Sequence, residues 1–259
     1  MAAEVPAQHL GQPPISRPTS LDAQLAAAVS KIAGHGHARL AVGIIDTNTG
    51  AEATYRPSAR LPGGGVVTAD LLAAVLLQHQ QHQSSLSDVD DELAKQMVET
   101  SNTLATGELW DAIDGSSGFG SANAALQLRG TTAFAAGLPG LSRTTVADQL
   151  QLLTDLVSAG SPLAPADRAY ELSLMQAASP SERWGVGAVA SPGTGCALVG
   201  ARLASRGEWV INSVGMVRHD GHMLLIAVLS VGSRTQAAGT SRVTAAALAA
   251  AGLITAAGS

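Results

Sequence analysis

Apolar residues at helical spacing open the patterned part of the chain. Leu21, Leu25 and Val29 recur every four residues, and Gly34 follows shortly after them. This spacing places the apolar side chains on one helix face, and the glycine favours an end to the helix. The pattern predicts an amphipathic helix over residues 21–33.

Two extended segments come next. Residues 40–46 form a short apolar run with β-branched side chains, and residues 52–55 resume an extended pattern. Between them, residues 46–50 (Asp-Thr-Asn-Thr-Gly) have the composition of a tight turn. We therefore predict an antiparallel hairpin.

A glycine-rich break at residues 63–65 precedes the most apolar helical segment, residues 66–83. Its apolar positions surround the helix almost completely, which predicts burial at the centre of a helical region. Thr145, with Asp148 three residues later, approximates a capping box at the start of another helix. Further helices are predicted at residues 88–98, 101–113, 120–128, 145–158 and 166–178.

The last third of the chain returns to extended patterns. Strands are predicted at residues 196–199, 209–214 and 223–229, a turn at 218–222, and a final alanine-rich helix from about 240. Hairpins, in place of alternating strand–helix–strand units, indicate an antiparallel sheet built from both ends of the chain.

The predicted fold class is therefore α+β. It has a five-stranded antiparallel sheet of two N-terminal and three C-terminal strands, terminal helices beside the sheet, and a helical subdomain at about 62–180. Residues 21–259 form one domain. Residues 1–20 are rich in proline, which disfavours helices and central strands, and they predict a flexible leader. We interpret the leader as the remainder of an exported precursor whose signal or lipid anchor was removed.

Composition narrows the range of partners. The 259 residues carry a formal net charge of −5, which offers no attractive field for phosphates, so no nucleic-acid partner is expected. No run of 18 apolar residues is present, so no transmembrane segment is expected. The single Cys196 excludes an internal disulfide and is interpreted as a buried structural residue. Alanine-rich, lysine-poor usage is typical of high-GC bacterial genomes, and we expect an actinobacterial source.

The order of elements over about residues 21–257 is similar to that of serine β-lactamases and penicillin-binding transpeptidases. In this family the central buried helix opens with Ser-x-x-Lys, in which the serine is the nucleophile. Residues 61–72 align with that helix start, with Gly65 at the serine position and Thr68 at the lysine position. Glycine offers no nucleophile, and threonine cannot act as a desolvated amine base.

A second match places Ser101, Asn102 and Thr103 at the family's Ser-Asp-Asn loop. The resemblance implies that Ser101 is retained, that Asn102 replaces the acid, and that Thr103 replaces the substrate-facing amide. The alternative interpretation, which we favour, is that Ser101 caps the helix that follows.

A third match places Val199, Gly200 and Ala201 where the family has Lys-Thr-Gly on the innermost strand, so the lysine that holds a substrate carboxylate is absent. No glutamate lies between Glu108 and Glu171, so the resemblance also leaves the carboxylate that activates the deacylating water without a counterpart. The residues carried forward as candidates for binding are Ser101, Thr103 and Arg202.

Histidine pairs are the remaining candidates for metal binding. Each pair lacks a third ligand at suitable spacing, apart from Asp220 beside the last, so we interpret them as solvated residues and expect no metal and no cofactor. The pairs are His35 with His37, His79 with His82, and His219 with His222.

These observations predict a catalytically inactive β-lactamase-like protein, exported to the cell envelope, that binds peptidoglycan-like material or a protein partner. One alternative is a cryptic serine hydrolase or esterase that uses Ser101, although the sequence shows no general base for it. A third possibility is a structural module whose groove is filled by side chains.

Overall fold

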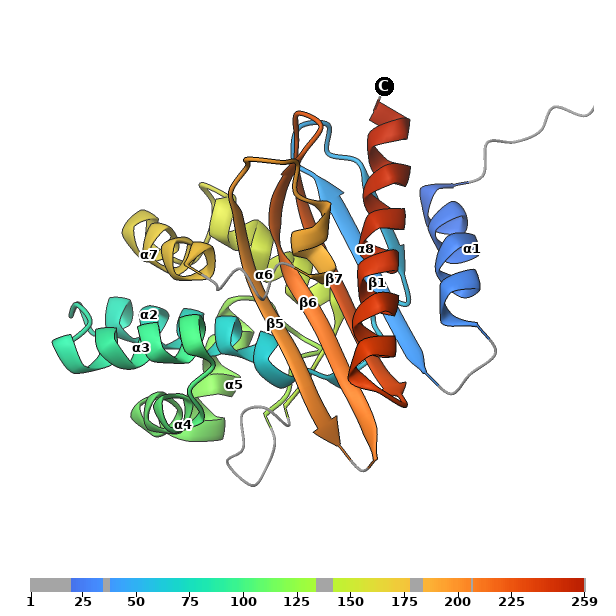
Figure 1. Ribbon diagram of the computed structural model, residues 1–259. Helices are drawn as coiled ribbons and strands as arrows, with labels where there is room; N and C mark the ends of the chain where they lie inside the picture. Colours follow the sequence, from blue (N-terminus) through green and yellow to red (C-terminus); the bar gives the residue numbers. More distant parts are fainter. Residues whose placement is uncertain (1–19, 35–37, 134–141, 178–183, 206, 259) are drawn as a thin grey trace, which may run out of the picture.

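The computed structural model describes residues 20–34, 38–133, 142–177, 184–205 and 207–258. A five-stranded antiparallel sheet runs through its centre in the order β2-β1-β7-β6-β5. Figure 1 shows helices α1 and α8 on one face of this sheet and helices α2 to α7 on the other. The strands are β1 (Arg39–Asp46), β2 (Glu52–Tyr55), β5 (Cys196–Ser205), β6 (Glu208–His219) and β7 (His222–Ser233).

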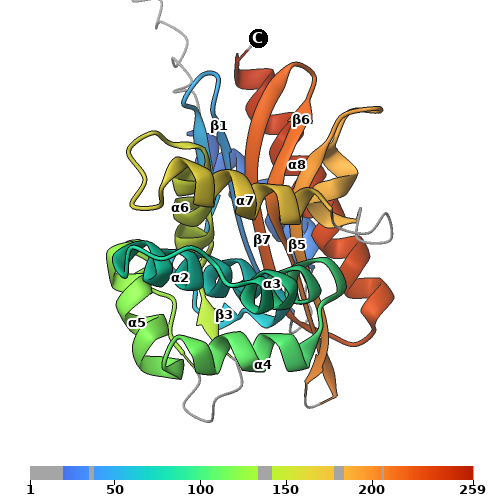
Figure 2. The same cartoon turned by 90° about the vertical axis from the view of Figure 1, so that its left-hand side faces the viewer.

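The terminal helices are α1 (Leu21–Ala33) and α8 (Gln236–Gly258). Between the two groups of strands, the chain builds a helical layer that lies in front of the sheet in Figure 2. Its helices are α2 (Val67–Gln81), α3 (Asp88–Thr100), α4 (Thr103–Ala112), α5 (Gly115–Ala125), α6 (Val146–Val157) and α7 (Pro165–Gln176). Its shorter elements are β3 (Leu61–Pro62), η1 (Gly64–Val66) and β4 (Arg143–Thr144). A further short 3-10 helix, η4 (Gly185–Val189), lies on the other face of the sheet, against α8.

The N-terminal and C-terminal strands form one sheet because β1 pairs with β7 along its whole length, for example Ile44 opposite Ile226. The predicted hairpin, the antiparallel sheet and the terminal helices are thus confirmed. Alternating side chains divide the interior into two cores. On β5, Val199 and Ala201 pack into the core shared with α2 to α7, whereas Leu198 packs into the core beneath α1 and α8.

Helix α2 lies at the centre of the helical layer, as its apolar sequence predicted. Its residues from Ala69 to Leu77 are all buried, and they include one acid, Asp70. A helix that is apolar on every side loses stability in water and is stabilised only when other elements surround it. Here α3, α4, α5 and α7 contact it.

Two local predictions need correction. Helix α5 begins at Gly115, not at residue 120, because Asp114 adopts a left-handed conformation (φ 62°) that starts the helix early. The Thr145 hydroxyl caps α6 as predicted, accepting from the Asp148 N–H at 3.1 Å. The Asp148 carboxylate does not complete the box; it accepts from the Thr131 hydroxyl instead. The leader and the His35–His37 pair lie outside the described residues.

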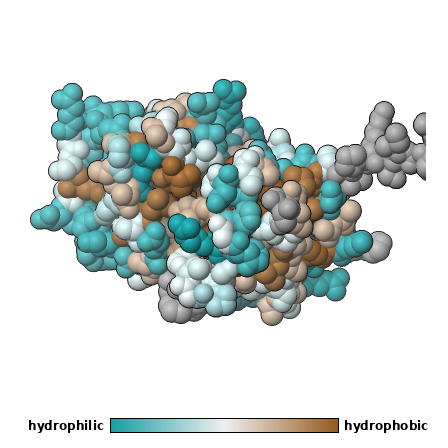
Figure 3. All heavy atoms as spheres, turned by 90° about the horizontal axis from the view of Figure 1, so that it is seen from above, coloured by the Kyte–Doolittle hydropathy of each residue, from teal (hydrophilic) through white to brown (hydrophobic). Residues whose placement is uncertain are grey.

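Helix α8 is the longest helix that the structure describes. Residues Gln236–Ala257 are long and apolar enough to cross a membrane by length and composition alone. In the fold, one face of this helix packs on the sheet. Its residues Val243, Ala246, Ala250 and Ile254 are fully buried in the core beneath α1 and α8. Seen from above in Figure 3, polar residues interrupt the apolar patches of the surface.

Candidate functional site

The start of α2 is fastened to the sheet by a buried amide. Asn212 on β6 is fully buried, and its Nδ2 donates to the carbonyl oxygens of Pro62 (2.8 Å) and Gly63 (2.7 Å). Its Oδ1 accepts from the Ser230 N–H at 2.8 Å. The amide nitrogen of this side chain therefore holds the segment before α2, while its oxygen ties the side chain to β7. Sequence analysis treated Asn212 only as part of a strand, although a lone amide within an apolar strand was a signal.

The same region brings the first and third motif positions together. A Cβ atom added to Gly65 would lie 2.5 Å from the carbonyl oxygen of Gly200, a separation that real Cβ atoms do not adopt. A Cβ atom added to Gly64, whose φ is +56°, would lie 2.7 Å from the Cβ of Ala201. Strand β5 thus packs directly against the start of α2, and its backbone leaves no room for any side chain at Gly65.

Thr68 is occupied within its own helix. Its hydroxyl donates to the carbonyl oxygen of Gly65 at 2.7 Å, and the residue is half-buried. This bond satisfies a backbone acceptor in the first helical turn. The Thr68 side chain therefore contributes to helix structure and carries no charge.

The second motif forms the joint between two helices. Ser101 ends α3 in a left-handed conformation (φ 55°, ψ 38°) and is exposed. Asn102, not Ser101, caps the next helix: its Oδ1 accepts from the N–H groups of Leu104 (2.9 Å) and Ala105 (3.2 Å). The expectation that Ser101 caps α4 is wrong, because the left-handed turn at Ser101 places the following residue at the cap. Thr103 is exposed in the first turn of α4.

No hydrogen bond between described residues joins Ser101, Asn102 or Thr103 to Gly65 or Thr68. The structure therefore unites the first and third motif positions by direct packing, while the hydroxyl of Ser101 has no hydrogen-bonded base among the described residues.

Arg202 lies on the opposite face of the sheet from the helical layer. Leu198 on the same strand packs beneath α1 and α8, and strict alternation along β5 puts Arg202 on that side too. Its guanidinium carbon lies 5.4 Å from the ring centroid of Trp184, which belongs to the same core. Arg202 therefore lies across the sheet from Ser101 and Thr103, and the three predicted binding residues do not line one site.

Two buried acids form a second polar cluster, inside the helical layer. Asp70 on α2 is fully buried, and the Gln149 amide on α6 donates to its two oxygens at 3.1 and 2.9 Å. The same amide nitrogen lies 3.0 Å from the Thr144 hydroxyl. Burial raises the pKa of Asp70 to about 7, because a charged carboxylate is poorly solvated there.

Glu171 on α7 is the other member of this cluster. It is fully buried, and neither carboxyl oxygen has a hydrogen-bond partner among the described residues. Burial raises its pKa well above the usual value, and the charge of Asp70 adds to the effect. Both carboxyl groups therefore keep a proton to a higher pH than they would in water. The sequence pattern did not predict this pair. Glu171 only marked the end of a stretch without glutamate, and Asp70 only fell within the aligned residues 61–72.

The described histidines of the predicted pairs bond to different partners. His222 lies 2.8 Å from a carboxylate oxygen of the buried Asp46, and His79 bonds to the Ser84 hydroxyl at 3.0 Å. His219 bonds to the carbonyl oxygen of Val189. Within the described part of the chain, no three His, Cys, Asp or Glu side chains gather to hold a metal ion.

The central antiparallel sheet, the terminal helices on one face and the buried helix at the centre of the other layer define the serine β-lactamase/transpeptidase fold. The predicted fold is thereby confirmed. A class A β-lactamase from Bacteroides cellulosilyticus DSM 14838 superposes with a TM-score of 0.78 at 13% identity, over 92% of this chain and 100% of that one. TLA-1 extended-spectrum β-lactamase gives 0.79 at 14% identity, over 90% and 98%.

The protein PBP-A is also similar, with a TM-score of 0.76 and 16% identity over 87% of this chain and 93% of that one. At these identities the likeness establishes the fold alone. No protein-family model and no curated protein matches the sequence.

Proposed function

We propose that this protein is a catalytically inactive member of its fold class that acts by binding. It is exported to the cell envelope, and it binds peptidoglycan-related material or a protein partner. The observation that carries the proposal is the packing at Gly65. Because the Gly200 carbonyl lies 2.5 Å from the position of a Cβ atom there, the position lacks both a nucleophile and the space for one.

Three further contacts support the proposal. The Thr68 hydroxyl is engaged by the Gly65 carbonyl oxygen, so no free base stands one turn into α2. Val199 and Ala201 are buried in the helical-layer core, where an inserted lysine would lose solvation. Asn212 holds the segment before α2 against the sheet, which keeps the start of α2 against β5.

The absence of acylation can be tested directly. We expect the purified protein to leave a chromogenic β-lactam unhydrolysed and to form no covalent adduct with a fluorescent penicillin, with an active class A β-lactamase as the positive control. Removing the catalytic groups of such a unit lowers rates by roughly 10⁴- to 10⁶-fold. Turnover, or an adduct of penicillin mass on the intact protein, would overturn the proposal.

The binding role needs its own measurement. Sedimentation with insoluble peptidoglycan tests the envelope ligand, with a cellulose suspension as the matched insoluble control. Retention on both materials, or on neither, would remove peptidoglycan as the ligand and leave a protein partner.

The second candidate is a serine hydrolase that uses Ser101. One observation favours it: Ser101 is exposed and holds a left-handed backbone conformation, of the kind found at strained functional positions. A fluorophosphonate probe followed by peptide mapping separates the candidates. Labelling of Ser101 that disappears in Ser101→Ala supports the hydrolase, and an unlabelled protein supports the inactive binder.

A further inference from the structure

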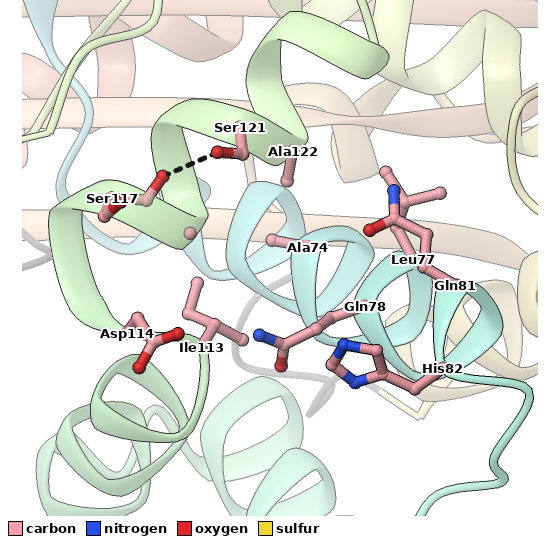
Figure 4. Close-up of a pocket in the computed structure, with 11 residues that line it drawn as sticks. Ala74, Leu77, Gln78, Gln81, His82, Ile113, Asp114, Ser117, Ser121 and Ala122 are labelled. Carbon is pink, nitrogen blue, oxygen red and sulfur yellow. Dashed lines mark hydrogen bonds between the residues drawn. The ribbon is translucent and has the colours of Figure 1, made fainter.

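A hollow of about 200 Å³ lies between the C-terminal half of α2 and helix α5. None of Gly65, Ser101 and Val199 lines it, so it is separate from the aligned motif positions. Figure 4 shows side chains from both helices directed toward this opening. Its volume is below the roughly 300–1,000 Å³ of sites for drug-sized ligands, so it suits a molecule of monosaccharide size.

Small residues keep the floor of the hollow open. Ala74 on α2 and Ala122 on α5 are both buried, and Leu77 and Ile113 complete an apolar base. A Cβ atom added to Gly118 would lie 1.6 Å from the carbonyl oxygen of Ile113, so the backbone of α5 packs directly on the turn before it. The floor is therefore held by close backbone packing and is preformed.

Polar side chains form the rim of the hollow. Gln78, Gln81 and His82 stand at the end of α2, and no hydrogen bond joins their side chains to another described residue. The Ser121 hydroxyl, by contrast, is engaged, because it donates to the carbonyl oxygen of Ser117 at 3.0 Å (Figure 4). Two amides and an imidazole thus remain available to a ligand.

Asp114 gives the rim its charge. It precedes α5, where an aspartate usually caps the first turn, yet its carboxylate makes no capping bond. Its left-handed backbone (φ 62°, ψ 32°) turns the chain at this point, and the side chain is exposed. Apart from His82 it is the only ionisable residue in the lining, and among described residues it forms no ion pair. A carboxylate that neither caps a helix nor pairs with a cation is suited to accept a ligand's positive group.

We propose that this hollow binds a small cationic amine that also carries hydroxyl groups, of amino-sugar size. The ammonium group pairs with the Asp114 carboxylate, and the hydroxyls exchange hydrogen bonds with the amides of Gln78 and Gln81. The apolar floor receives the C–H face of the ligand. No Phe, Tyr or Trp side chain lines the hollow, so the charge at Asp114 sets the preference.

Glucosamine, glucose and N-acetylglucosamine test this preference, because they share a ring and differ at C2. Titrations are followed by ¹H–¹⁵N NMR on the intact protein. We expect glucosamine at millimolar concentration to shift the amide signals of residues 78–82 and 114–122, and the two uncharged sugars to shift them less. Equal shifts from all three sugars, or no shifts in these segments, would contradict the proposal.

The decisive variant is Asp114→Asn. Asparagine tolerates the left-handed backbone as well as aspartate does, so the fold is retained. We expect glucosamine affinity to fall about tenfold, the loss of one charge-assisted contact, with glucose unaffected. Asp111→Asn is the matched control, since this exposed acid on α4 does not line the hollow. Unchanged glucosamine binding in Asp114→Asn, or an equal loss in Asp111→Asn, would overturn the assignment.

Discussion

Replacement of Asp70 by asparagine makes the stability of the protein less sensitive to pH. Asp70 is fully buried, and its only side-chain hydrogen-bond donor in the described structure is the amide of Gln149. Burial raises its pKa from 3.8 to about 7. In the unfolded chain the group ionises near its ordinary value, so the folded state binds more protons than the unfolded state between these two pKa values.

This difference in bound protons sets the direction and the size of the change in stability with pH. Stability is highest below the unfolded pKa, falls as pH rises from about 4 to about 7, and then stays level with respect to this group. A shift of about three units corresponds to about 4 kcal/mol at most, at about 1.4 kcal/mol per unit. Asparagine is neutral throughout, so the free energy of unfolding of Asp70→Asn, relative to the native protein, should increase by up to about 4 kcal/mol between about pH 4 and about pH 8.

Urea unfolding followed by circular dichroism measures this change at the two pH values. Asp111→Asn, an exposed carboxylate on α4, is the control and should show no such dependence. Glu171→Gln should change stability in the same direction, because burial also raises the pKa of Glu171 and the charge of Asp70 contributes. If Asp70→Asn and the native protein differ by the same amount at both pH values, Asp70 is ionised in the folded state and the reasoning is refuted.

Four other substitutions test the packing of the motif region. Gly65→Ser should destabilise the protein by about 1–3 kcal/mol, because the new Cβ atom would meet the Gly200 carbonyl. Gly107→Ser is the control and should not destabilise it, because a Cβ atom there meets no atom within 4 Å. Equal thermal midpoints of the two variants would contradict the close packing at Gly65. Asn212→Ala should cost about 2 kcal/mol or more in chemical unfolding, because two carbonyls and one N–H lose their partner; a neutral result would mean that solvent replaces the amide. Asn102→Ala should lower the free energy of unfolding by about 1 kcal/mol, because a helix cap is lost. Ser101→Gly should raise it by up to about 1 kcal/mol, because glycine adopts the left-handed backbone without strain. If the thermal midpoints of the two variants fall in the reverse order, Ser101 is the cap.

The sequence by itself determined the elements and their order. The structure contains the helix predicted from the spacing of Leu21 to Val29, the turn at residues 46–50 and the all-round apolar α2. Each of these patterns depends on 15 residues or fewer. That positions 65 and 68 hold glycine and threonine, and not serine and lysine, can likewise be read directly from one segment of the sequence. Periodicity and propensity act locally, so a single sequence is enough to predict them.

Tertiary structure alone decided what those positions contact. Sequence spacing could not show that the Gly200 carbonyl would occupy the space beside Gly65, or that Arg202 would face Trp184 and not the helical layer. Asp70 and Glu171 come from helices far apart in the chain, and their pKa values depend on burial created only when α2, α6 and α7 pack together. Desolvation and close contact are properties of the folded assembly of segments, whereas local patterns are properties of each segment.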